Sequence, residues 1–562
     1  MDQMVRDGWG GDELVFLPLG GAGEIGMNLN LYGYGGKWLM VDLGITFADE
    51  TLPGIDIVTP DPTFIAQRRD DLLGIVITHA HEDHLGAVPH LWERLRQPIY
   101  ATPFAAAVLR GKLGEAGLLD EVPLHEVPLG GRIELDPFVI DLISITHSIP
   151  EPNALAIRTP AGVVLHTGDW KLDPEPLLGP TTDESALRQL GDEGVLALVC
   201  DSTNVFNPGE SGSEATVREN LMQIVAERRG RIAVTTFASN VARIETVAEV
   251  ARANGREIAI VGRSLWRMIA AARQTGYFDF AGPLLGEDEG GYLPADKVLY
   301  LCTGCQGEPR AAMSRIAAGD HPHVVLDAGD TVVFSSKIIP GNERPIGRLH
   351  DRLALAGIEV ITERDSVIHV SGHPNRDELS RMYQWARPSI AVPVHGEMRH
   401  LIAHAAMARS LQVPRAIAPE NGQVIRLGPG APEIVGEVQA GRLLVDGQVI
   451  APDQGEALRT RRRLMYNGGA VVTLIADPGG RLLAEPSVVL QGIPVDDADP
   501  DIDASIRAAI GDALRPLSPG ARRDDARMSE AARLAVRRLL KARFGKRPVV
   551  EVRVARVGTA AE

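Results

Sequence analysis

The hexapeptide His-Ala-His-Glu-Asp-His at residues 79–84 restricts the fold more than any other part of the sequence, because it directly follows the apolar run LLGIVIT. Side chains alternate along an extended segment, so His79 and His81 point to one side, while Asp83 and His84 follow where the chain turns. Imidazole and carboxylate groups are the usual ligands of Zn²⁺ and similar metals. A surface cluster beside a helix start would explain one or two histidines. So dense a group at a strand end instead predicts two metals about 3.5–4 Å apart, an arrangement suited to phosphoryl hydrolysis.

Three further residues follow β-forming runs in the same way and complete a ligand set. His147 ends LISITH, Asp169 follows VVLHTG and His395 follows IAVPV. Singly, each would be read as a core or turn residue. Together they predict His79, His81 and His147 on one metal, Asp83, His84 and His395 on the other, and Asp169 bridging the two. Asp42, after KWLMV, is expected to orient a ligand imidazole.

The pattern of strand-like and helix-like stretches changes twice along the chain, which indicates an inserted domain. Residues 1–211 read as short strands separated by Gly, Pro and Asp. Residues 212–372 alternate strands with helical stretches such as NVARIETVAEVARANG, which predicts a doubly wound α/β domain with a parallel sheet. Residues 373–452 again show short strand-like runs like those of residues 1–211, so they are expected to complete the first domain.

The last part of the chain reads as a linker, residues 453–466, and a small α/β domain, residues 467–562. Its helix SEAARLAVRRLLKARFG is expected to begin at Ser529 as N-cap and to stop at Gly545. The region 522–556 is rich in Arg and Lys. Such a run is either a solvated helix face or a surface that contacts RNA or another subunit.

Composition places mild limits on the partners and the location of the protein. The net charge of −17 argues weakly against a nucleic-acid partner, but net charge does not report the sign of one groove. Three cysteines are too few for a disulfide framework. No signal peptide and no apolar run of roughly 18 residues is evident, so a cytoplasmic location without membrane attachment is expected.

Three other sequence patterns resemble binding motifs. GAGEIG, residues 21–26, fits the dinucleotide fingerprint, but strand-like residues follow it where that motif requires a helix. We therefore expect a strand-to-strand loop near the metals. Cys302 and Cys305 lack a second pair and favour packing over metal ligation. Asp56 and Asp446 are weak candidates for a structural cation site.

The hexapeptide has the form H-x-H-x-D-H, and with the later His, Asp and His it resembles the metallo-β-lactamase fold, an αββα sandwich. An inserted α/β domain that begins after CDSTN and closes with HVSGH looks like that of the β-CASP nucleases. The stretches PLGGAGEIGMN, TFASN, TGCQGEP, SSKIIPGNE, HVSGH and PVHGE together resemble the bacterial ribonuclease J family over about residues 14–450. The C-terminal domain resembles that family more loosely.

The resemblance implies roles for particular residues. Asp201, His373 and His395 correspond to three β-CASP motifs, and His at the third is typical of the RNA-processing branch. Two groups are implied to contact RNA: Ser239 and Asn240 on the backbone, and the segment His369, Val370, Ser371, Gly372 and His373 on the phosphate nearest the metals. Small residues there would expose backbone N–H groups to phosphate. In the implied mechanism, a hydroxide steered by Asp83 attacks phosphorus and His373, oriented by Asp201, protonates the leaving 3′ oxygen.

The resemblance implies a metal-dependent ribonuclease of RNA decay and maturation: a 5′→3′ exonuclease that prefers single-stranded RNA with a 5′-monophosphate, with some endonuclease activity. A homodimer or homotetramer that works with other RNA-decay proteins is expected. The ligand set suits Zn²⁺ best and tolerates Mn²⁺. The alternatives are a β-CASP DNA-repair nuclease, a small-substrate metallo-hydrolase such as a lactonase, and a non-catalytic scaffold, which the complete ligand set disfavours.

Overall fold

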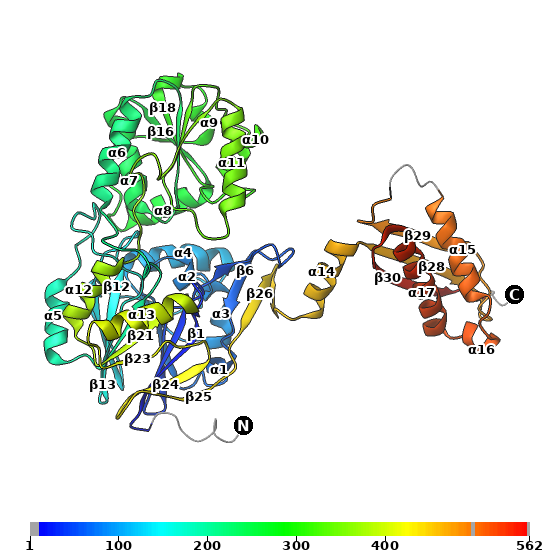
Figure 1. Ribbon diagram of the computed structural model, residues 1–562, viewed down its shortest axis with the longest axis horizontal. Coiled ribbons are helices and arrows are strands. Elements are labelled where there is room, and N and C mark those ends of the chain that lie inside the picture. Colours follow the sequence, from blue (N-terminus) through cyan, green and yellow to red (C-terminus); the bar gives the residue numbers. More distant parts are fainter. Residues whose placement is uncertain (1–10, 281, 496–500, 559–562) are drawn as a thin grey trace. The chain divides into compact units, whose positions relative to one another are not determined.

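The computed structural model describes residues 11–280, 282–495 and 501–558. The chain forms two compact units, which are Met1–Thr46 with Thr59–Arg442, and Phe47–Val58 with Leu443–Glu562 (Figure 1). Among the helices of the described residues, none combines the length and the apolar content needed to cross a bilayer.

Two mixed sheets pack face to face in the first unit. The first has the order β25 (Glu433–Glu437), β24 (Gln423–Gly428), β1 (Leu14–Gly20), β3 (Leu29–Tyr34), β4 (Lys37–Val41), β7 (Leu72–Val76), β8 (Ile99–Ala101) and β9 (Leu124–Glu126). The second has the order β10 (Arg132–Leu135), β11 (Phe138–Ser144), β12 (Asn153–Thr159), β13 (Gly162–His166), β14 (Ala197–Asp201), β21 (Ile390–Val394) and β23 (Arg415–Ala416). Their facing side chains share one apolar core, which includes Phe16, Val41, Ile140, Leu155 and Val199. Central strands such as β1 are buried at every position, because both of their faces are covered.

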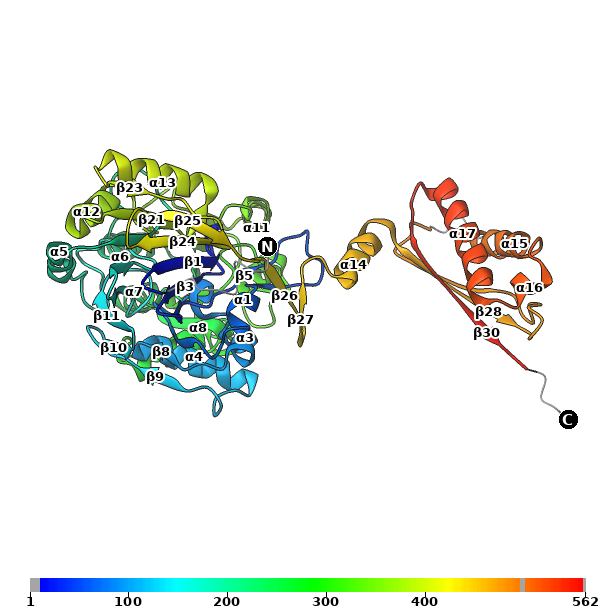
Figure 2. The same ribbon diagram turned by 90° about the horizontal axis from the view of Figure 1, so that it is seen from below.

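Helices cover the outer faces of both sheets (Figure 2). On the first sheet lie α1 (Thr63–Ala66), α3 (Val88–Leu95) and α4 (Pro103–Ala116). On the second lie α5 (Glu184–Glu193), α12 (Arg376–Ala386) and α13 (Met398–Ser410), which form a second apolar layer with it. The predicted αββα sandwich is confirmed.

An α/β domain is inserted into this sandwich. Its six strands are all parallel, in the order β17 (Leu284–Leu285), β16 (Glu257–Val261), β18 (Val298–Cys302), β15 (Ile232–Thr235), β19 (Thr331–Phe334) and β20 (Glu359–Ile361). The connecting segments include α6 (Glu214–Ala226), α7 (Val241–Ala253), α8 (Arg263–Gln274), α9 (Glu287–Gly290), a 3₁₀ turn (Ala295–Lys297), α10 (Ala312–Ala318) and α11 (Glu343–Leu355). The domain leaves the sandwich after β14 and returns before β21. These two strands are parallel neighbours with Asp201 opposite Val394, so the insertion opens and closes at one place in the second sheet.

The GAGEIG loop joins strands, as predicted. Within it β2 (Ala22–Gly23) pairs with β22 (Gly396–Glu397), and the chain then enters β3. Gly21 has a positive φ of 87°, and its carbonyl accepts a 2.7 Å hydrogen bond from the backbone N–H of His395. The loop therefore holds a predicted metal ligand rather than a dinucleotide.

The second unit contains a sheet of order β29 (Ser487–Gln491), β28 (Gly469–Ala476) and β30 (Val549–Arg556). Its helices are α14 (Glu456–Asn467), α15 (Ile502–Leu514), α16 (Pro519–Arg522) and α17 (Asp525–Phe544). A small sheet of β5 (Thr46–Phe47), β6 (Ile57–Pro60), β26 (Arg442–Asp446) and β27 (Val449–Pro452) lies where the chain passes between the units.

Two expectations about the second unit need comment. Helix α17 begins one turn before Ser529, because the Asp524 carboxylate accepts the backbone N–H groups of Ala526 and Arg527 and is the N-cap. Gly545 ends the helix in a left-handed conformation, as predicted. Asp446 forms a 2.7 Å ion pair with Arg461, and the structural cation site at Asp56 and Asp446 stays a prediction.

Candidate metal centre

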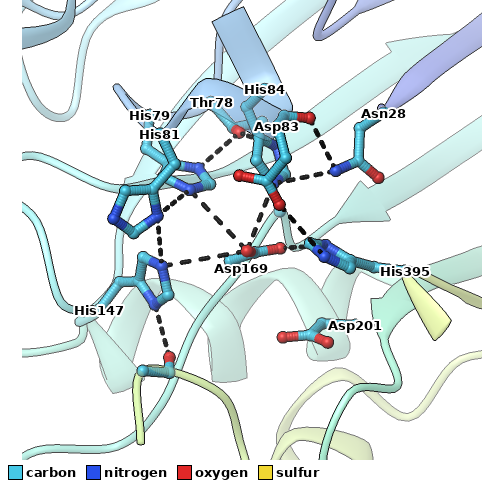
Figure 3. Close-up of polar contacts among 12 residues, drawn as sticks. Asn28, Thr78, His79, His81, Asp83, His84, His147, Asp169, Asp201 and His395 are labelled. Carbon is cyan, nitrogen blue, oxygen red and sulfur yellow. Dashed lines mark hydrogen bonds and ion pairs between the residues drawn. The ribbon is translucent and has the colours of Figure 1, made fainter. Parts of the chain in front are cut away.

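The predicted ligands lie at one end of the sandwich, just beyond the carboxyl ends of four strands. The hexapeptide follows β7 of the first sheet and continues into the short helix α2 (Glu82–Leu85). His147, Asp169 and His395 follow β11, β13 and β21, which run in the same direction in the second sheet. Strand direction therefore brings together residues that are more than three hundred positions apart (Figure 3).

One ligand group consists of His79, His81, His147 and Asp169, whose nearest donor atoms all lie within 4.8 Å of one another. His81 Nδ1 is 3.1 Å from His79 Nε2 and 3.0 Å from His147 Nε2. Asp169 Oδ2 lies 3.9 Å from the Nε2 atoms of both His79 and His147. The three imidazoles and one carboxylate oxygen thus face a common point.

The second group consists of Asp83, His84, His395 and the same Asp169. Asp169 Oδ2 is 3.3 Å from His84 Nε2, and Asp83 Oδ2 is 3.4 Å from His395 Nε2. Asp169 Oδ1 lies 2.6 Å from His395 Nδ1. Asp169 belongs to both groups, so its carboxylate lies between them, and its role as a bridge between two metals stays a prediction.

The donor set fits a pair of divalent metals. The Nε2 atom of His395 is buried and has no hydrogen-bond partner among the described residues. Buried polar atoms in proteins almost always have a partner, so atoms left this way indicate a ligand. Burial also lowers the pKa of His81 to about 4 and lowers that of His79, which favours the neutral imidazole that binds metal.

A second layer of residues fixes the orientation of His84. Asp42 Oδ2 lies 2.7 Å from His84 Nδ1, as predicted, and Asp42 also accepts hydrogen bonds from the backbone N–H and hydroxyl of Thr78. On the other side, the amide of Asn28 donates to the Asp83 carbonyl at 3.0 Å. Asp42 and His395 adopt positive φ values of 66° and 51°, which are strained for non-glycine residues and are typical of functional sites.

The chain returns from the inserted domain through residues 369–373, which we call the return segment, and this segment lies against the centre. The Nδ1 of His373 is 2.8 Å from Asp201 Oδ2 and 3.8 Å from Asp169 Oδ2. Burial alone would lower the pKa of His373, but the carboxylates of Asp201 and Asp169 outweigh it and raise the pKa to about 9. His147 Nδ1 donates to the Gly372 carbonyl at 2.5 Å. A Cβ at Gly372 would lie 2.6 Å from the His147 ring, so only glycine allows this approach.

The other residues predicted to contact RNA differ in how far they are buried. Ser239 is half-buried, whereas Asn240 is buried because its side chain caps α7 and contacts Glu214. Val370 is buried, and the His369 Nδ1 is buried without a hydrogen-bond partner. Asn240 and Val370 thus make local packing contacts, and their contact with RNA stays a prediction.

Asn204 was not predicted, although it ends the CDSTN stretch. Its amide donates to Ser371 Oγ at 2.8 Å and to the His373 carbonyl at 3.0 Å. The Ser371 hydroxyl also accepts the His373 backbone N–H at 3.1 Å. Asn204 therefore holds the return segment from the sandwich side, and its place three residues after Asp201 is the signal that could have identified it.

Known sequence families match four successive stretches of the chain. Residues 27–202 match the metallo-beta-lactamase superfamily, and residues 229–353 match the family described as "Ribonuclease J, beta-CASP domain". Residues 357–417 match the "Zn-dependent metallo-hydrolase RNA specificity domain", and residues 456–557 match the "Ribonuclease J C-terminal domain". Among solved structures, a protein of unknown function from Enterococcus faecalis has the same fold over 74% of this chain and all of its own, with a TM-score of 0.50 and 16% identity.

Curated relatives match nearly the whole chain. Ribonuclease J of Sinorhizobium meliloti is 47% identical over 97% of this chain and 98% of its own length. Ribonuclease J of Synechocystis is 39% identical over 85% of this chain and 76% of its own, and that of Thermus thermophilus is 37% identical over 83% of both. The chain therefore belongs to the ribonuclease J family.

Proposed function

We propose that the protein is a metal-dependent ribonuclease that hydrolyses phosphodiester bonds in single-stranded RNA. One observation carries the proposal: the return segment 369–373 brings His373, paired with Asp201, within 3.8 Å of the carboxylate shared by both ligand groups. A proton donor beside a site for two metals is an arrangement suited to hydrolysis of a phosphodiester. The similarity to ribonuclease J from three genera supports RNA as the substrate.

The proposed mechanism assigns work to the chain's own residues. Seven side chains would hold two divalent ions, for which Zn²⁺ suits the donors best and Mn²⁺ is an alternative: His79, His81, Asp83, His84, His147, Asp169 and His395. Such ions lower the pKa of bound water and neutralise charge on phosphate oxygens. Asp83, which is partly exposed, would orient the attacking water, and His373 would protonate the leaving 3′ oxygen. Asn204 and Asp201 hold His373 in place for that transfer.

We further propose that the activity is chiefly 5′→3′ exonucleolytic, prefers a 5′-monophosphate end, includes some internal cleavage, and serves RNA decay and maturation. The half-buried Ser239 and the unpartnered His369 Nδ1 offer groups for a terminal phosphate. A homodimer or homotetramer is proposed as the assembly, which light scattering would measure.

The test compares one RNA with a 5′-monophosphate and with a 5′-triphosphate, in the presence of Zn²⁺ or Mn²⁺. We expect release of mononucleotides from the monophosphate form and little from the triphosphate. The variant Asp83→Ala serves as the catalytic control and should be inactive on both. Internal cuts of equal rate in both RNAs would make the enzyme an endonuclease, and equal cleavage of single-stranded DNA would favour the DNA-repair alternative.

Replacing His373 with Gln should lower the rate of cleavage about 10²- to 10⁴-fold, the usual contribution of a general acid. Glutamine keeps a hydrogen bond to Asp201 but has no transferable proton. Single-turnover rates on the monophosphate RNA measure the effect, and metal content should stay unchanged. A substrate whose leaving group needs no proton should be cleaved by both forms at similar rates; an equal loss on that substrate would assign His373 a positioning role instead.

A further inference from the structure

The second unit carries exposed cations that the proposed mechanism does not use. Residues 531–550 contain seven Lys or Arg and no Asp or Glu, although acids outnumber bases by 74 to 57 in the whole chain. Like charges placed together repel one another, which opposes the compact state. A surface that binds a polyanion requires this kind of segregation.

The fold brings the ends of α14 and α17 together. Gly545 ends α17 with a φ of +68°, and the chain turns back toward the end of α14. Lys546 Nζ then donates to the Tyr466 carbonyl at 2.9 Å, and the Arg547 N–H donates to Asn467 Oδ1 at 3.1 Å. Arg463 lies one helical turn before Tyr466. We call the resulting surface, made of Arg463, Tyr466, Lys541, Lys546 and Arg547, the basic–aromatic patch.

The patch is open to a partner. The Tyr466 side chain is 65% exposed, and the four cations are exposed. Within the part of the chain that the structure describes, none of these four cations pairs with an acidic side chain. In the first half of α17, by contrast, Arg527 pairs with Asp524 and Arg533 pairs with Glu530. The helix dipole favours Lys541 in the last turn, but it does not explain the other three cations, which lie outside α17.

We propose that the basic–aromatic patch binds single-stranded RNA at a second place, separate from the metal centre. The cations contact backbone phosphates and the Tyr466 ring stacks on a base, the combination that binds single strands without sequence preference. This inference rests on the proposed function in that RNA is the substrate. A long RNA held at two places gains affinity through effective concentration, whereas a short RNA that fills only the metal centre does not.

The experiment uses the full chain with Asp83→Ala to prevent cleavage. The probes are fluorescein-labelled oligo(A) of 5 and of 40 nucleotides, and anisotropy is measured over a series of KCl concentrations. We expect the triple variant Lys541→Gln, Lys546→Gln, Arg547→Gln to bind the 40-mer about tenfold more weakly and to reduce the slope of log affinity against log salt by about 2. Tyr466→Ala should weaken 40-mer binding, and Tyr466→Phe should restore it, because phenylalanine also stacks.

A matched control removes the same charge from the same unit. Arg507, Arg515 and Arg533 are paired with Glu485, Asp512 and Glu530. Their triple replacement by Gln should leave 40-mer binding nearly unchanged.

The outcomes separate this proposal from the proposed function. Unchanged 40-mer binding in the patch variant, or an equal loss in the control, overturns the patch as an RNA site. A changed molecular mass in light scattering, without a change in RNA affinity, assigns the surface to a second copy of the chain and also overturns it. Cleavage of the 5-mer by the chain with its native Asp83 tests the metal centre alone, so its absence refutes the proposed function whatever the patch does.

Discussion

Replacing Asp169 with Asn should abolish RNA cleavage, with a loss of about a thousandfold or more. Burial would raise the pKa of Asp169, but the imidazoles of His395 and His84 outweigh it and hold the pKa well below its usual range. The side chain is therefore an ionised carboxylate, and it is the one residue that both ligand groups share. Asparagine has nearly the same size as aspartate but lacks the negative charge that would hold two cations together.

The measurement combines metal content, determined by mass spectrometry of the dialysed protein, with single-turnover cleavage. We expect bound metal to fall from two ions per chain to one or fewer. Asp141→Asn is the matched control, since Asp141 lies on β11 in the same sandwich and pairs with Arg132 and Arg158, away from the ligand groups. Two tightly bound ions and full-rate cleavage in the Asp169 variant would contradict the bridging role.

Replacing Arg243 with Met should destabilise the first unit by about 3–5 kcal/mol, because it leaves the buried carboxylate of Glu214 without its partner. Both side chains are almost fully buried, and Arg243 donates to both Glu214 oxygens at 2.9 and 3.1 Å. Its guanidinium also donates to the backbone carbonyls of Ser335 and Ile368, at 3.0 and 2.9 Å. Arg243 thus joins α6, α7 and β19 to the start of the return segment.

Urea unfolding followed by circular dichroism would measure the loss. The double variant Arg243→Met, Glu214→Leu should regain much of it, since an apolar pair carries no unpaired charge. Arg188→Met is the control, because its ion pair with Glu184 is half-exposed and should contribute less than about 0.5 kcal/mol. A loss below about 1 kcal/mol in Arg243→Met would mean that solvent reaches Glu214 in the folded protein.

The comparison of sequence and structure shows which kinds of residue can be predicted. His147, Asp169 and His395 could be placed near the hexapeptide because each follows an apolar run, and strands of common direction end at one edge. Arg243 and Glu214 look like ordinary residues of amphipathic helices, but they are buried where α6, α7 and the chain around Ser335 and Ile368 meet. Thr78 and Asn28 likewise act through contacts with distant backbone. Long-range contacts of this sort leave no periodic or local pattern.

The start of α17 shows a different limit. Asp524 and Ser529 are both good N-cap residues, and the sequence between them has no helix breaker. The structure selects the earlier one, which lets Met528 join the apolar core of the second unit. Local capping preferences in the sequence do not separate the two starts; in the structure Asp524 caps the helix and Met528 is buried as well.

The pairing of β14 with β21 has a consequence for how such enzymes can diversify. Because these neighbouring strands carry Asp201 and His395 at their ends, the distance between those two residues is set by the sheet and not by the length of the intervening chain. Domains of different size and charge can therefore be exchanged at this junction without moving the ligands. What each new domain must supply is a closing segment that reaches His147 and Asp201, as Gly372 and His373 do here.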